Sequence, residues 1–148
     1  MEKQNEIVLK VSSYSMSPGP RYCDQGDSSG EDFYHKMLNK YFTKAFLENK
    51  KLVVDLDGPD GYASSFLDEA FGNLIFDFGI KQVKKRINIL SNEEPEWLSM
   101  IYENTFEEWE KRKNSNEEPK VTANHDKWSR LIDNKIVEKQ WIPMCSGK

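Results

Sequence analysis

The sequence has few residues that could form a metal site, a disulfide framework or a membrane span. Its 148 residues include two cysteines and two histidines. Cys23 and Cys145 lie far apart, with neither CxxC spacing nor a clustered histidine, so we expect free thiols and no structural zinc. No apolar run approaches the roughly 20 residues that cross a bilayer, and the polar start MEKQNEI is no signal peptide. These absences predict a cytoplasmic protein with no membrane contact, no metal and no cofactor.

A strong positive charge is also missing. Lys and Arg number 21 against 25 Asp and Glu, which gives a formal net charge of −4 and a pI near 5.3. Non-specific binding to nucleic acid depends on attraction to phosphate, so nucleic acid is not an expected partner. With 37% apolar residues, the chain can build one ordinary domain with little left over.

Three segments show the apolar period of amphipathic helices. The first covers about residues 30–46, the second 66–78 up to Gly79, and the third 91–118. The third has an acidic start and a basic end, which suits the helix dipole. A weaker period over 124–138 predicts a short fourth helix near the C-terminus.

Short apolar runs between these segments predict three strands, at 7–11, 52–56 and 83–90. Strands and helices therefore alternate along the chain. Such alternation favours an α/β fold with a mainly parallel or mixed sheet and helices packed on it.

The C-terminal part differs in composition from the rest. We expect an α/β domain over 1–113, a polar linker over 114–120, and a helical tail over 121–148. Trp128 and Trp141 are costly to expose, so the tail should pack on the domain, on a second copy or on a partner. A homo-oligomer formed through the tail is one possibility.

Two carboxylates follow the central predicted strand. Asp55 and Asp57 are two residues apart, an arrangement found in magnesium-dependent phosphatases with an aspartate nucleophile. The other residues that such enzymes need are absent from the chain. The simpler interpretation is that Asp57 and Asp60 form a turn with their neighbouring glycines.

The loop over residues 18–31 lies between the first strand and the first helix. Arg21, Ser28, Ser29 and Gly30 could hold an anion or a nucleotide there, at the carboxyl end of the sheet. The alternative is a plain connection, with a serine as helix cap and Arg21 paired to a carboxylate.

Two serines begin the second helix. Phosphorylation of Ser64 or Ser65 would add about −1.5 to −2 charge at this helix start, which is a workable switch position. The alternative is structural, because Ser65 and Asp68 also form an approximate capping box.

Other polar residues suggest no chemistry. His35 and His125 are isolated in the sequence, with no spacing that suits a metal. Lysines on an exposed edge strand protect it from pairing with another chain, which suffices to explain one basic cluster: Lys81, Lys84, Lys85 and Arg86.

Several strings together resemble a known family. They are PGPRY and SGEDF within residues 18–33, VDLDG at 54–58, and SSFLDEAFG at 64–72. On these the chain resembles, over about residues 5–90, the bacterial STAS-like family, a domain of unknown function. That family is similar to the sulfate-transporter and anti-sigma-factor-antagonist domains, which are small α/β folds.

The resemblance implies a regulatory role. In anti-sigma-factor antagonists, a serine that starts the helix after the central strand is phosphorylated by a partner kinase. The unmodified domain binds a GHKL-type ATPase or an anti-sigma factor, and phosphorylation releases it. By position Ser65 matches this serine and Ser64 is its neighbour, while Ala63 and Phe66 replace the usual aspartate and glycine.

The sequence therefore predicts a non-enzymatic regulatory protein that switches partners. Its partner-binding surface would consist of Tyr62, Ser64, Ser65, Phe66 and Glu69, facing a GHKL-type ATPase or an anti-sigma-like protein. One alternative is an anion or nucleotide sensor built on the 18–31 loop. A second alternative is the magnesium-dependent phosphatase.

Overall fold

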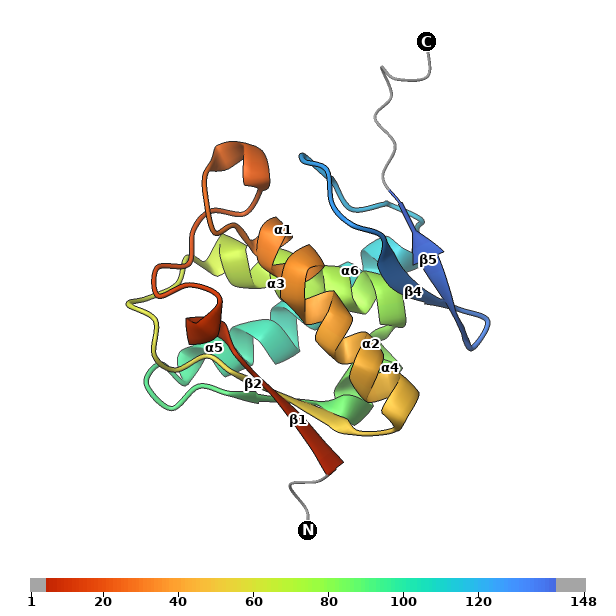
Figure 1. Cartoon of the computed structure of the whole chain (residues 1–148), viewed down its shortest axis with the longest axis horizontal. Coiled ribbons are helices and arrows are strands. Elements are labelled where there is room, and N and C mark those ends of the chain that lie inside the picture. The colour runs from red at the N-terminus through yellow and green to blue at the C-terminus, as the bar shows by residue number, and fades with distance from the viewer. Residues whose placement is uncertain (1–4, 141–148) are drawn as a thin grey trace.

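The computed structural model describes residues 5–140 (Figure 1). Its main sheet has three parallel strands. Its strands are β1 (Glu6–Lys10), β2 (Lys51–Asp55) and β3 (Ile87–Leu90), in that spatial order. Val8 of β1 pairs with Val53 of β2, which pairs with Asn88 of β3. The predicted α/β class is confirmed.

The first two predicted helices are present. Helix α1 (Gly30–Phe33) continues through a π-helical turn, Tyr34–Leu38, into α2 (Asn39–Glu48). Helix α3 (Ser64–Phe78) ends at Gly79, whose φ of 88° lies in the left-handed region that glycine tolerates best. The apolar period located both helices, although only α2 buries a single face, since α3 is buried on all sides from Phe66 to Phe78 except at Asp68.

The third predicted helix begins later than the sequence suggested. It consists of α5 (Glu96–Ser99), a π-helical turn at Met100–Thr105, and α6 (Phe106–Asn114). Pro95 precedes its first residue, and the hydroxyl of Ser91 donates to the carbonyl of Glu94 in the loop before it. A start at residue 91 was therefore wrong, because that loop is tied together by its own hydrogen bonds.

The third predicted strand is too long. Residues Ile80–Arg86 form helix α4, and only the last four residues of the predicted run pair as β3. The basic cluster at Lys81, Lys84, Lys85 and Arg86 thus lies on a helix, and its explanation as edge-strand protection was wrong. Three of these cations end α4, where positive charge suits the helix dipole.

The tail is a β-hairpin and not the helix that we expected over 124–138. Strands β4 (Trp128–Ile132) and β5 (Lys135–Lys139) pair antiparallel. Asp133 and Asn134 form the turn, both with positive φ, as the tightest hairpins require. Trp141 and Cys145 lie outside the described residues.

The main chain of the hairpin is hydrogen-bonded to a side chain of α2. The amide of Asn39 donates to the carbonyl of Ser129 at 2.9 Å and accepts from its N–H at 3.0 Å. Trp128 is 8% exposed and meets the ring of His35 edge-on. Within residues 5–140 the tail therefore lies against the domain.

One hydrophobic core fills the space between the sheet and the helices. Leu9, Val54 and Ile89 lie side by side on the face of the sheet that the helices cover. On the other face Val8 is 53% exposed and Asn88 is exposed. Among residues 5–140, every helix is too short or too polar to span a lipid bilayer.

Candidate functional site

The two serines that the sequence singled out open helix α3. Ser64 is the first helical residue and is exposed, while Ser65 is half-buried. The N-cap is Ala63, which makes no side-chain capping bond. Asp68 instead accepts hydrogen bonds from Arg21, Thr105 and Trp109. The proposed Ser65–Asp68 capping box is therefore not formed, and neither serine hydroxyl caps the helix.

Two residues of the predicted partner surface are buried. Phe66 has no exposed area and Glu69 is 1% exposed, so neither can face a partner, and the prediction was wrong for both. Glu69 contacts Arg21 at 3.1 Å and accepts from the side-chain amide of Asn73. Burial raises the pKa of Glu69, although Asn73 and Arg21 act against it. Tyr62 is half-buried, and its hydroxyl donates to the carbonyl of Leu56.

The loop over 18–31 forms a connection and not the predicted anion site. Arg21 donates to Asp68 at 2.8 Å and to Glu69, so its charge is already neutralised. Ser29 caps α1 by accepting from the N–H of Asp32. The other N–H groups of the first turn of α1 also have partners, since Gly30 donates to Pro20, Glu31 to Arg21 and Phe33 to Ser29. Ser28 is half-buried at a φ of 55°.

The carboxylates of Asp55 and Asp57, at the end of β2, hold neighbouring loops together. Asp55 accepts from the N–H of Asp57. Asp57 in turn accepts from the N–H groups of Asn92 and Glu93, which follow β3. The N–H of Glu93 is the largest influence that lowers the pKa of Asp57. Asp57 therefore joins the carboxyl ends of β2 and β3, whereas the sequence predicted only a local turn there.

Sequence reasoning missed a cluster around Glu31, which is 1% exposed. Its carboxylate accepts from the N–H of Cys23 at 2.9 Å and from the N–H and hydroxyl of Thr122 at 2.9 and 2.6 Å. Nε2 of His125 lies 2.8 Å from the same carboxylate. Burial alone would raise the pKa of Glu31, but the bonds from His125 and Thr122 outweigh it and lower the pKa to about 2. His125 is 94 positions from Glu31, so no local pattern could reveal this contact.

The comparison with known families concerns the part of the chain that holds β2, β3 and α1 to α4, without the edge strand β1. Residues 29–97 match the family described as a STAS-like domain of unknown function. This match confirms the resemblance, and it includes Ser64, Ser65 and Glu31. No curated protein and no solved structure matched the chain. A STAS-like domain suggests a regulatory role through protein interaction.

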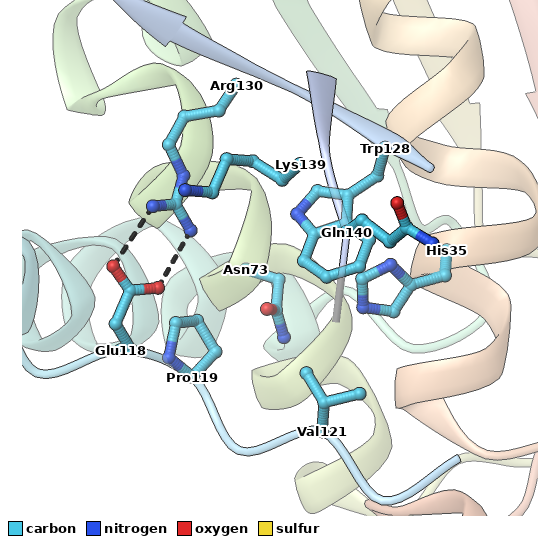
Figure 2. A pocket seen from close by; sticks show the side chains of 9 residues that line it. All are labelled: His35, Asn73, Glu118, Pro119, Val121, Trp128, Arg130, Lys139 and Gln140. Atoms are coloured by element: carbon cyan, nitrogen blue, oxygen red, sulfur yellow. Dashed lines mark hydrogen bonds and ion pairs between the residues drawn. The ribbon is translucent and has the colours of Figure 1, made fainter. Parts of the chain in front are cut away.

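The hairpin lies outside the STAS-like match and closes a cavity of about 270 Å³ against α3 (Figure 2). Arg130 points toward Glu118 at one end of this cavity, while Trp128 and His35 lie at the other. The remaining lining residues are Asn73, Pro119, Val121, Lys139 and Gln140. Arg130 makes two contacts of 3.0 Å with Glu118 and one of 2.7 Å with the buried Asp77. The cavity therefore has a guanidinium whose charge is already paired.

Proposed function

We propose that this STAS-like domain regulates a partner protein that binds at the start of α3, and that phosphorylation of Ser64 or Ser65 releases the partner. The observation that carries the proposal is the exposure of Ser64 in the first turn of a 15-residue helix whose N-cap makes no side-chain hydrogen bond. A phosphate at a helix start is favoured by the helix dipole. A phosphate on either serine would therefore be compatible with the folded helix α3.

The surface that we propose for the partner surrounds these serines. We call it the helix-start surface and define it by Met16, Asp60, Tyr62, Ser64 and Ser65. Met16 is 51% exposed, and its carbonyl accepts from the N–H of Asp60, which fixes the two loops together. An exposed methionine is adaptable in contacts with a partner. This set replaces the buried Phe66 and Glu69 of the sequence-based prediction.

The negative charge of the phosphate would release the partner. Asp57 and Asp60 lie on the loop between β2 and the serines, and the structure describes no ion pair for either. A phosphate on Ser64 would add to this negative charge, and a partner surface selected for the neutral hydroxyl would have to desolvate the phosphate. The partner class remains the one that the family resemblance implies, a GHKL-type ATPase acting as kinase or an anti-sigma-like protein.

Ser64→Glu is expected to weaken partner binding by about tenfold or more, because the added carboxylate imitates part of the phosphate charge. The measurement is a pull-down from the native host with wild-type protein, Ser64→Glu and Ser65→Glu, read by mass spectrometry for partners and phosphosites. Ser115→Glu is the matched control. Ser115 is exposed and follows α6, whose Lys113 contacts the opposite end of α3 at Phe76.

An ATPase retained by wild type and by Ser115→Glu, but lost by Ser64→Glu or Ser65→Glu, would support the switch. Equal capture by all four proteins, with no phosphate on Ser64 or Ser65, would show that the serines only begin the helix. The proposal would then be abandoned.

A further inference from the structure

We propose that Cys23, Glu31 and His125 bind a divalent transition-metal ion of the zinc class. The thiol sulfur, a carboxylate oxygen and an imidazole nitrogen of these residues all lie within 4.8 Å of one another. Thiolate, imidazole and carboxylate groups are the usual protein ligands of Zn²⁺, at about 2.0–2.3 Å. Small side-chain movements would bring all three atoms to those distances around one ion.

The three ligands come from separate segments that the fold already holds together. Cys23 begins a short 3₁₀ turn (Cys23–Gln25), Glu31 lies in α1, and His125 lies in the segment that leads to β4. The N–H of Cys23 and the N–H of Thr122 both donate to the Glu31 carboxylate. Because these bonds are to main-chain groups, they fix the positions of two segments without using the thiol or the imidazole.

Neighbouring side chains support the ligands. The ring of His35 stacks on that of His125 with centroids 4.1 Å apart and planes at 16°, which restrains the orientation of His125. The hydroxyl of Ser29 donates to the sulfur of Cys23 at 3.3 Å. Residues that orient a ligand in this way commonly tune metal affinity. Within residues 5–140, Nδ1 of His35 is buried with no hydrogen-bond partner, so one polar atom beside the three ligands makes no hydrogen bond.

The site has an entrance. Cys23 and His125 line a surface hollow of about 240 Å³, together with Ser28, Ser29 and Asn124. Its size leaves room for a water molecule as a fourth ligand. An ion could therefore reach Cys23 and His125 from this hollow without unfolding of the hairpin.

Protons must leave when the ion binds. A cysteine binds Zn²⁺ as the thiolate, so the Cys23 sulfur must give up its proton when the ion binds. Zn²⁺ would bind the Cys23 sulfur as the thiolate and His125 through an unprotonated ring nitrogen, and the thiol proton would go to solvent. Affinity should therefore fall as the pH is lowered.

The test is a titration of the full-length, chelator-treated protein with Zn²⁺ and separately with Co²⁺. We expect a single ion per chain, a thiolate-to-cobalt charge-transfer band in the ultraviolet, and a melting temperature several degrees higher with Zn²⁺. Cys23→Ser and His125→Asn should each weaken binding at least about tenfold and remove or shift that band. Cys145→Ser, which removes the other cysteine, should bind as wild type does.

Urea unfolding in the presence of chelator checks that each variant folds. If wild type binds no Zn²⁺, or if Cys23→Ser binds it as tightly as wild type, the cluster is a hydrogen-bonded clamp only. Loss of binding in Cys145→Ser alone would likewise assign the ion to another place. None of these results depends on the helix-start surface, so the metal site and the partner switch can fail separately.

Discussion

Gly72→Ala should destabilise the domain by about 3 kcal/mol, close to the upper end of what overpacking of a core usually costs. A Cβ atom at Gly72 would lie well under 3.0 Å from the indole ring of Trp109, nearer than real Cβ atoms approach. The ring cannot easily yield. It is 2% exposed, its Nε1 donates to Asp68 at 3.2 Å, and the Arg112 guanidinium lies 3.9 Å from its centre. Helices α3 and α6 would have to separate.

Urea unfolding measures this effect, and two further variants make it specific. Gly61→Ala is the matched control, because a Cβ there meets nothing within 4 Å, and we expect a change of less than about 0.5 kcal/mol. Adding Trp109→Leu to Gly72→Ala removes the clash, so the double variant should be more stable than the sum of the single changes predicts. Equal stability of Gly72→Ala and Gly61→Ala would contradict the close packing of α3 on α6.

Arg130→Met should lower the free energy of unfolding by about 3–5 kcal/mol at neutral pH, because it leaves the buried charge of Asp77 without its partner. Asp77 is 1% exposed, and Arg130 donates to it at 2.7 Å. The hydroxyl of Tyr34 donates to the same carboxylate but carries no charge to balance it. Lys135→Met, which removes an exposed cation of the same hairpin, should have little effect.

The loss in Arg130→Met should depend on pH. Burial raises the pKa of Asp77 from 3.8 to about 6, even though Arg130 lowers it. A carboxyl group with a raised pKa in the folded state contributes stability below its unfolded pKa, and that contribution is lost as the pH rises through the folded pKa. Without Arg130 the folded pKa rises further. The penalty should therefore be small near pH 4 and grow through pH 6 toward neutrality.

Unfolding free energies of wild type and Arg130→Met, measured over this pH range, test the expected slope. Asp77→Asn in the Arg130→Met background has no carboxyl to ionise, so the extra pH dependence should disappear. A penalty in Arg130→Met that stays constant across the range would show that the arginine acts through packing and not through the charge of Asp77.

The sequence was informative where a local pattern reflected burial. The period of apolar residues located α2 and α3, and the nearly continuous run from Leu52 to Leu56 predicted the central strand, because a parallel strand is apolar on both faces. The alternation of these segments was enough to predict the α/β class.

Other features have no local pattern that marks them. The four-residue strand β3 directly follows helix α4, so the predicted strand, which began at Val83, ran across the boundary between the two elements. Phe66 and Glu69 were expected at the surface, but α1 crosses them so closely that a Cβ at Gly30 would overlap the Phe66 carbonyl. The hairpin was hidden because its spacing fits a helix unless the Asp133-Asn134 turn is recognised. The Glu31 and His125 contact joins segments that no local pattern relates.

The attachment of the hairpin through Asn39 affects which substitutions the chain can tolerate. The side-chain amide of Asn39 hydrogen-bonds both the N–H and the C=O of Ser129, as the main chain of a neighbouring strand would. Any residue except proline presents the same two groups there, so the side chain at 129 can vary without loosening this attachment. Position 39 has no such freedom, since its amide must both donate and accept.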